Sequence, residues 1–209
     1  MIYLSGTLKP KEIANRLDIG LLLGFRPGGD FNGQAKYVDR ILWAADNNCF
    51  NDPAVKAEDY LTWLERMSPF RENCLFANAL DVVGDAAKTW ERSRDVLPEI
   101  RRLGYPAALV AQDGMEDRPV EWDAFDCLFI GGSTEWKLSG DAFWLCREAQ
   151  KQGKWVHMGR VNSKRRILQA RFAGCNSVDG TFLKFGPDVN LPTLEKWLDF
   201  IHKQPVLNF

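Results

Sequence analysis

Short apolar runs alternate with helical patterns along the whole sequence, and this alternation most limits the fold. Runs such as Leu21-Leu22-Leu23 are apolar at successive positions, which is typical of strands buried on both faces of a parallel sheet. Strands are predicted at residues 1–5, 19–25, 41–45, 75–80, 107–111, 127–130, 155–158 and 176–178. Because parallel strands need crossover connections, the pattern predicts an α/β fold of right-handed βα units.

The segments between these strands carry helical periodicity and helix boundary signals. Helices are predicted at residues 10–17, 33–40, 55–67, 85–103, 120–125, 139–152, 163–172 and 191–203. Pro98 is expected to kink or split the fourth of them. Asp52, Asp85, Ser139 and Asn162 are the expected N-caps. Eight βα units predict one domain, residues 1–209, folded as a closed (β/α)8 TIM-type barrel; the alternative is a doubly wound open sheet.

Composition excludes several classes of protein. The chain has 209 residues, which suffices for one domain with a sizeable core, and its net charge of −1 draws it to neither nucleic acid nor membrane as a whole. No apolar stretch is long enough to span a membrane, and no signal peptide is visible, so we expect a cytoplasmic protein. Five widely spaced cysteines form no CxxC pair, which predicts buried free thiols and neither a metal nor a cofactor.

Carboxylates follow three of the predicted strands. Asp46, Asp81 and Asp179 lie at the ends of such runs, and Gln112 and Gly131-Gly132 end two others. A single aspartate in this position is commonly a turn former or a helix cap. Because the active site of a parallel barrel surrounds the C-terminal ends of its strands, the three together predict an acidic site there.

Six motifs at these strand ends carry a resemblance to a known family. They are Asp-Asn-Asn-Cys-Phe at 46–50, Ala-Leu-Asp-Val at 79–82, Val-Ala-Gln-Asp-Gly at 110–114, Ile-Gly-Gly at 130–132, His-Met-Gly at 157–159 and Ser-Val-Asp-Gly-Thr at 177–181. In this order they resemble the tRNA-guanine transglycosylases, and more closely the shorter phage-type DNA transglycosylase-like proteins that insert 7-deazaguanine bases. The resemblance covers about residues 40–182.

The resemblance implies a pentosyltransferase that exchanges guanine in a polynucleotide for a 7-deazaguanine derivative. In such an enzyme Asp179 matches the nucleophile that forms a covalent glycosyl intermediate on the sugar. Asp46 matches the general acid and base that serves the leaving and incoming bases. Asp81 matches the carboxylate that reads the guanine edge, and Gln112 and Gly132 match the groups that bind the base carbonyl.

Further positions complete this expected site. Phe50 and Met158 match the pair that sandwiches the base, and Gly131 and Gly159 match its glycine walls. Independently of the family, residues 160–166 present a basic cluster at the start of a predicted helix, where free N–H groups and the helix dipole favour a phosphate. Its members are Arg160, Ser163, Lys164 and Arg165. The alternative for this cluster is a solvated basic helix face.

The chain departs from the family in three places, one of which is Glu135, since the family places the glutamate after Gly-Gly further along. No cluster of cysteines and a histidine follows the last predicted helix, so the family's C-terminal zinc subdomain is not expected and DNA is favoured over tRNA. Asn47-Asn48-Cys49 replaces the usual serine-glycine pair, which predicts a different pocket floor. The expected partners are therefore nucleic acid and a free 7-deazaguanine base. Two alternatives stay open: a hydrolase of N-glycosidic bonds, and a non-catalytic barrel that binds nucleobases or nucleic acid.

Overall fold

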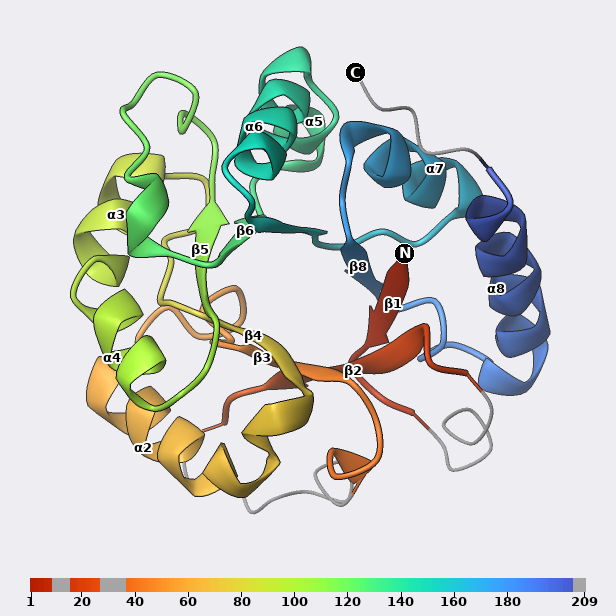
Figure 1. The fold of residues 1–209 in the computed structure, drawn as a ribbon, viewed down its shortest axis with the longest axis horizontal. Coiled ribbons are helices and arrows are strands. Elements are labelled where there is room, and N and C mark those ends of the chain that lie inside the picture. Colours follow the sequence, from red (N-terminus) through yellow and green to blue (C-terminus); the bar gives the residue numbers. More distant parts are fainter. Residues whose placement is uncertain (9–15, 27–36, 205–209) are drawn as a thin grey trace.

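Eight parallel strands close into a barrel in the computed structural model of this chain, which describes residues 1–8, 16–26 and 37–204 (Figure 1). The strands are β1 Ile2–Ser5, β2 Ile19–Gly24, β3 Trp43–Asp46, β4 Cys74–Asn78, β5 Ala107–Ala111, β6 Cys127–Ile130, β7 Trp155–Met158 and β8 Ser177–Gly180. Each strand pairs with the next along the chain, and β8 pairs with β1, where Leu4 lies opposite Asp179. The predicted closed barrel is confirmed, and the open sheet is wrong.

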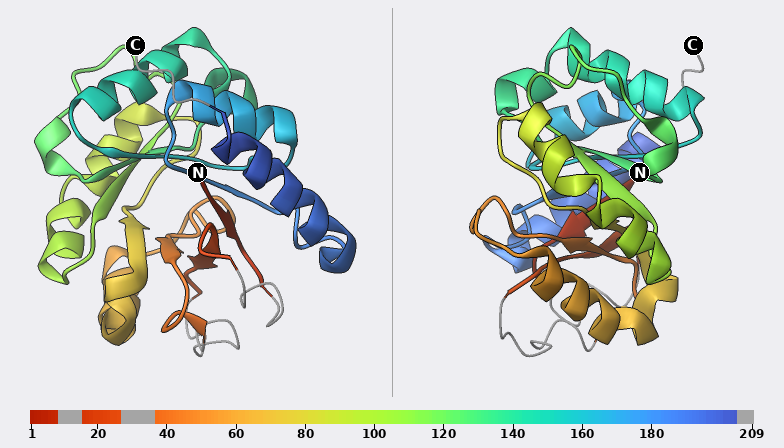
Figure 2. Two further views of the ribbon diagram at one scale, coloured as in Figure 1. Left: turned by 45° about the vertical axis from the view of Figure 1, so that its right-hand side comes forward. Right: turned by 90° about the vertical axis from the view of Figure 1, so that its left-hand side faces the viewer.

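Helices form an outer layer around the strands, as the views in Figures 1 and 2 show. They are α2 Ala57–Met67, α3 Ala86–Ser93, α4 Val96–Arg102, α5 Thr134–Lys137, α6 Gly140–Lys151, α7 Lys164–Ala173 and α8 Pro187–His202, with 3-10 helices η2 Ser68–Asn73 and η3 Trp122–Ala124. The helices predicted at 10–17 and 33–40 fall mostly outside the described residues. None of the described helices is both long enough and apolar enough to cross a membrane.

Polar side chains set the starts of several helices. Asp85 and Ser139 cap α3 and α6 as predicted, each accepting a hydrogen bond from a backbone N–H of the first turn. Asn162 was the wrong choice for α7, because Ser163 caps that helix. The Oδ1 atom of Asn162 instead accepts from the backbone N–H of Thr181 at 2.6 Å, which links the loop after β7 to the loop after β8.

Two other helix boundaries differ from the prediction. Asp52 caps no helix: its Oδ1 accepts from the N–H of Ala54 in a local turn, and α2 begins after Lys56. Pro98 neither kinks nor splits a helix. It lies in the first turn of α4, where a missing N–H costs no intrahelical hydrogen bond, and the break between α3 and α4 falls earlier, at Arg94 and Asp95.

The core has two apolar layers. The larger layer lies between the strands and the helices and includes Trp43, Leu64 and Phe125. The smaller layer fills the barrel interior and consists of Leu4, Ala44, Phe76, Ala108, Val110, Cys127 and Phe129. Since strand side chains alternate between faces, residues two positions beyond these interior positions also face inward, at the C-terminal end of the barrel.

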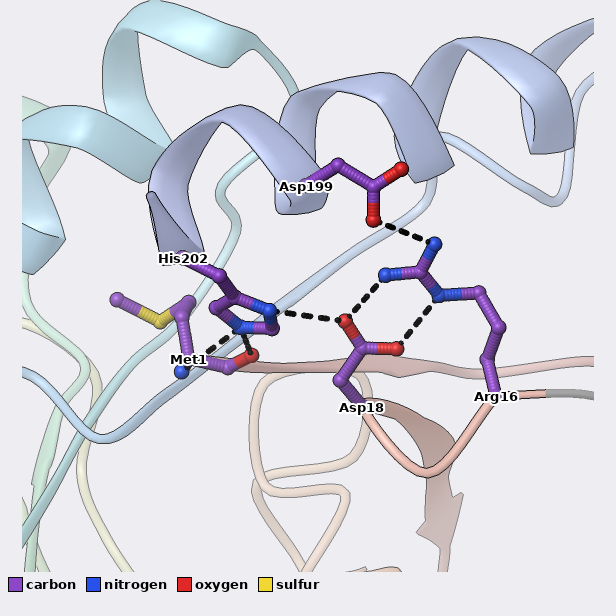
Figure 3. A network of polar contacts seen from close by, with 5 residues as sticks. All are labelled: Met1, Arg16, Asp18, Asp199 and His202. Carbon is purple, nitrogen blue, oxygen red and sulfur yellow. Dashed lines mark hydrogen bonds and ion pairs between the residues drawn. The ribbon is translucent and has the colours of Figure 1, made fainter. Parts of the chain in front are cut away.

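A polar network lies at the opposite, N-terminal end of the barrel, between α8 and the segments before the first two strands (Figure 3). Arg16 donates to both carboxylate oxygens of Asp18 at 2.7 Å and to Asp199 of α8 at 2.9 Å. His202 lies 3.6 Å from Asp18 and contacts the backbone of Met1. Burial acts to raise the pKa of Asp18, but hydrogen bonding to Arg16 and its charge outweigh burial and lower that pKa. The network ties α8 to the first two strands.

Candidate active site

A cavity of about 360 Å³ opens at the C-terminal ends of the strands, within the size range of small-molecule sites. Most of the residues singled out from the sequence line it: Asp46, Phe50, Asp81, Gln112, Gly131, Gly159, Arg160 and Asp179. They come from loops that follow separate strands, and closure of the barrel brings them together. The structure therefore brings these predicted residues together around one cavity.

Asp46 ends β3 and has its side chain partly open to the cavity. Surrounding protein removes most of its water, and this burial, with the nearby negative charge of Asp179, raises the pKa of Asp46 to about 6. The backbone N–H of Asn48, at 3.4 Å, and the side chain of Asn78 act in the other direction. A carboxyl group with this pKa can give and take a proton near neutral pH.

Asp179 is held in place from below by a buried histidine. Its Oδ1 lies 3.0 Å from Nε2 of His157, and its Oδ2 accepts from the backbone N–H of Arg160 at 3.3 Å. His157 is fully buried between the rings of Phe76 and Phe129, with ring centroids at 4.9 and 4.6 Å. With two donors and a rigid neighbour, the Asp179 carboxylate is fixed in orientation.

The hydrogen bonds below His157 fit one tautomer. Trp155 donates its indole N–H to Oγ of Ser177 at 2.8 Å, so the hydroxyl proton of Ser177 is free to point at Nδ1 of His157, also at 2.8 Å. Nδ1 then accepts, and Nε2 carries the proton that it donates to Asp179. The chain of bonds therefore directs the Nε2–H of His157 at Oδ1 of Asp179 and holds the ring in place.

Both carboxylate oxygens of Asp81 accept hydrogen bonds from side-chain amides. Asn47 donates to its Oδ1 at 2.8 Å, and Gln112 donates to its Oδ2 at 2.6 Å. Burial raises the pKa of Asp81, and these two hydrogen bonds partly offset that rise. Oε1 of Gln112 in turn accepts from the N–H of Gly84 at 2.9 Å. The trio forms a fixed wall of the cavity.

Arg160 joins three strand ends. Its Nη2 donates to the carbonyl oxygens of Gly131 and Gly132, and its guanidinium lies 5.1 Å from the centre of the Phe50 ring. Its backbone is in the left-handed region, with φ of 60°, which is unusual for a residue other than glycine and is found most often at functional sites. This conformation aims its N–H at Asp179.

Glycine is required at two positions of the cavity wall. A Cβ atom at Gly159 would lie 2.9 Å from the ring of Phe129 and 3.2 Å from Oδ1 of Asp179, and one at Gly131 would lie 2.6 Å from a side-chain methyl of Val110. Gly159 therefore lets β7 pass close to the acidic group. The carbonyl of Gly159 also accepts from the buried Nζ of Lys137 at 2.7 Å, and burial lowers the pKa of that lysine to about 8.

Other predicted site residues lie away from the cavity. Met158 is buried in the layer between strands and helices, because it alternates with the inward His157, so it cannot sandwich a ligand with Phe50. Gly132 is beside the cavity but does not line it.

The predicted phosphate cluster is not gathered in one place. The ammonium of Lys164 lies 3.8 Å from the centre of the Phe200 ring of α8, and Ser163 uses its hydroxyl as the helix cap. Arg166 donates to the carbonyl of Arg160, while Arg165 is exposed. Of this cluster only Arg160 lines the cavity.

Three side chains of the site were not singled out from the sequence: His157, Asn78 and Lys184. His157 and Asn78 lie inside predicted strands, where polar residues at inward positions next to the strand end are the available signal. Lys184 follows the last strand in a turn, and the sequence offers no signal for it. Among the described residues, no group of three or more His, Cys, Asp or Glu side chains is arranged to hold a metal ion.

Comparison with known proteins identifies no family for the chain. No protein-family model and no curated protein matches it. Among solved structures it is similar to a protein of Silicibacter pomeroyi DSS-3 described as a glycerophosphoryl diester phosphodiesterase, with 18% sequence identity and a TM-score of 0.47. The match covers 80% of this chain and 54% of the other, so the chain spans about half the length of that protein.

The resemblance to tRNA-guanine transglycosylases is therefore wrong, and with it the expectation of a base-exchanging pentosyltransferase. The solved structure found carries a different description, that of a glycerophosphoryl diester phosphodiesterase. The geometry agrees with this correction at two positions. Met158 faces the helices instead of a ligand, and both oxygens of Asp81 are occupied by amides of the protein. Short motifs at strand ends recur because barrels place polar residues there, whatever their ancestry.

Proposed function

We propose that the cavity is the active site of an acid–base enzyme that acts on a small polar molecule. Asp46 carries the proton, and Asp179 is a fixed carboxylate that stabilises positive charge as it develops on the substrate. The observation that carries this proposal is the pairing of two aspartates from β3 and β8 on one cavity, one of them clamped by His157 at 3.0 Å.

Different environments support the different roles of the two carboxyl groups. Asp46 has a pKa of about 6, so it is protonated in a useful fraction of molecules near neutral pH. Asp179 receives hydrogen bonds from His157 and from the backbone of Arg160, which fix the orientation of its carboxylate. Two titratable groups held in contrasting environments are the usual arrangement of an acid–base pair.

Two further expectations from the sequence concern the partner and the location of the protein. Nucleic acid stays a predicted partner, supported by Arg160 and Lys184 on the cavity, whereas the deazaguanine partner is withdrawn with the family. We place the protein in the cytoplasm, because its five cysteines are free and buried, as is usual in a reducing compartment.

The proposal is tested by activity profiling with a small-molecule cell extract. The wild type, Asp46→Asn and Asp179→Asn are each incubated with the extract, and mass spectrometry follows which compounds are depleted and which appear. Asp199→Asn is the matched control, since it makes the same change on an aspartate of α8 at the other end of the barrel.

We expect a substrate and product pair with the wild type and with Asp199→Asn. Loss of either cavity carboxylate should slow that turnover roughly 100-fold or more. A turnover that proceeds equally well in Asp46→Asn and Asp179→Asn would overturn the proposal, as would a wild type that changes no compound in the extract.

A further inference from the structure

The carbonyl of Asn78 is the one buried polar side-chain atom of the cavity that lacks a hydrogen-bond partner within the described part of the chain. Asn78 ends β4, lines the cavity and is 1% exposed, yet its Oδ1 accepts no hydrogen bond. Its amide contacts Asp46 and favours the ionised carboxylate, which leaves the carbonyl as a free acceptor beside that acid. A buried polar atom without a partner is destabilising, so its presence in a cavity indicates a ligand that donates to it.

The charges of the cavity are unevenly distributed. Asp46, Asp81 and Asp179 contribute three carboxylates, against the two cations Arg160 and Lys184. The amide of Asn78 and the carboxylate of Asp46 lie together at adjacent strand ends, where they offer hydrogen-bond acceptors and negative charge. A ligand group that binds there is favoured if it carries N–H donors and a positive charge.

The cationic part of the cavity has different chemistry. Within the described residues the guanidinium of Arg160 donates only through Nη2, so its Nε and Nη1 are left for an acceptor on a ligand. Lys184 is exposed and lines the same cavity, and its ammonium makes only a distant contact, 5.8 Å, with the ring of Phe185. An arginine fork and a lysine together suit a phosphate or carboxylate group.

We infer that the ligand is an amine-bearing organic anion, whose ammonium group binds Asn78 Oδ1 and Asp46 while its phosphate or carboxylate binds Arg160 and Lys184. This ligand class rests on the proposed function in that it assigns the substrate of the same site. The cavity of about 360 Å³ suits such a small molecule.

The test measures binding by isothermal titration calorimetry near neutral pH. The probes are aminoalkylphosphonates of increasing chain length, with ω-amino carboxylates of matching length as a second series. Simple alkylamines and alkylphosphonates are the single-ended controls. We expect one chain length to bind at least roughly tenfold more tightly than either control, because only a molecule of the right span satisfies both ends. The series that binds more tightly identifies the anionic group.

Two variants locate the two ends. Asn78→Leu should weaken the best aminoalkylphosphonate roughly tenfold and leave the alkylphosphonate unchanged. Lys184→Gln, at an exposed position that tolerates change, should weaken both of these phosphonates and leave the alkylamine unchanged. If Asn78→Leu does not fold, the comparison of probes on the wild type and on Lys184→Gln still decides the question.

The inference is overturned if no chain length exceeds the better of its two controls, or if folded Asn78→Leu binds the probes as the wild type does. These results are separable from a failure of the acid–base function, because the phosphonates bind without turnover. Tight, Asn78-dependent binding together with unimpaired turnover in Asp46→Asn would retain the ligand class and reject the catalytic role.

Discussion

The two ends of the barrel treat their aspartates in opposite ways. At the N-terminal end Asp18 is bonded twice to Arg16 and lies near His202, and its pKa is lowered (Figure 3). At the C-terminal end Asp46 has no cation in contact within the described residues, and its pKa is raised to about 6. Both groups are partly withdrawn from water, so the difference comes from their partners.

This contrast separates stability from chemistry. An ion-paired carboxylate stabilises the folded chain, whereas a buried carboxylate beside another negative charge destabilises it and persists where function requires it. The N-terminal network joins α8 to the first two strands and so fastens the closure of the barrel. We therefore expect substitutions at the two ends to affect different measurements.

The largest effect should come from the carboxylates of the cavity. Asp46→Asn and Asp179→Asn should each reduce turnover roughly 100-fold or more, because one removes the proton carrier and the other the fixed negative charge. Initial rates on the substrate found by profiling check this, with Asp199→Asn as the control. Equal rates in the wild type and the three variants would show that the aspartates at the two ends of the barrel do not differ in their effect on turnover.

The pH dependence of stability should differ in sign between the ends. The folded pKa of Asp46, about 6, lies above its ordinary value of 3.8, so its protonated form favours folding at low pH, and this contribution is lost as the pH rises toward 6. Asp46→Asn should therefore be more stable than the wild type at pH 7 by up to about 3 kcal/mol.

Urea denaturation at several pH values measures this difference. The advantage of Asp46→Asn should be small near pH 4 and grow up to about pH 6. The pKa of Asp18 is lowered in the folded state, so its ionised form stabilises the fold at pH values above its unfolded pKa. This stabilisation is lost as the pH falls through the folded pKa. An Asp46→Asn protein that is less stable than the wild type at neutral pH would contradict the raised pKa of Asp46.

Removal of the central cation at the N-terminal end should reduce stability without reducing activity. Arg16→Met leaves Asp18 and Asp199 without their partner, and Arg16 and Asp18 have side chains only 19% and 15% exposed. The free energy of unfolding should fall by about 1–3 kcal/mol. Denaturation curves and turnover rates measured on the same preparations test this prediction. A loss of turnover with an unchanged free energy of unfolding would contradict it.

The smallest effect on stability should come from His202, the exposed histidine of that network. His202 is more exposed than Asp18 and lies 3.6 Å from it, so His202→Asn should change the free energy of unfolding by about 0.5 kcal/mol or less. Thermal denaturation checks this expectation. A loss as large as that of Arg16→Met would show that His202, and not Arg16, is the main support of the network.

Most of the barrel could be predicted from the sequence because it depends on local patterns. The apolar runs that became β5, β6 and β7 have the predicted boundaries, since each is bounded by residues that end a strand. Helix starts were less predictable: Asn162 and Ser163 are adjacent cap formers, and only the pairing of Asn162 with Thr181 across two loops decides between them. Tertiary contacts of this kind leave no local pattern.

The convergence of the strand-end aspartates was predictable from the sequence, and their hydrogen-bond partners were not. Asp46, Asp81 and Asp179 converge because parallel strands in a barrel share one C-terminal end. Their states depend on neighbours from other strands: Asn47 and Gln112 saturate Asp81, and His157 fixes Asp179. Because those neighbours come from distant segments, the local motifs did not reveal them.

The most direct test of the contrast is the pKa of Asp46 itself, measured by carbon-detected NMR titration of the aspartate carboxyl groups. The wild type should show one aspartate titrating at about pH 6, absent from Asp46→Asn, and its pKa should fall in Asp179→Asn because a neighbouring negative charge is removed. An Asp46 that titrates at its ordinary value near 3.8 and does not respond to Asp179→Asn would contradict the account of the acidic site.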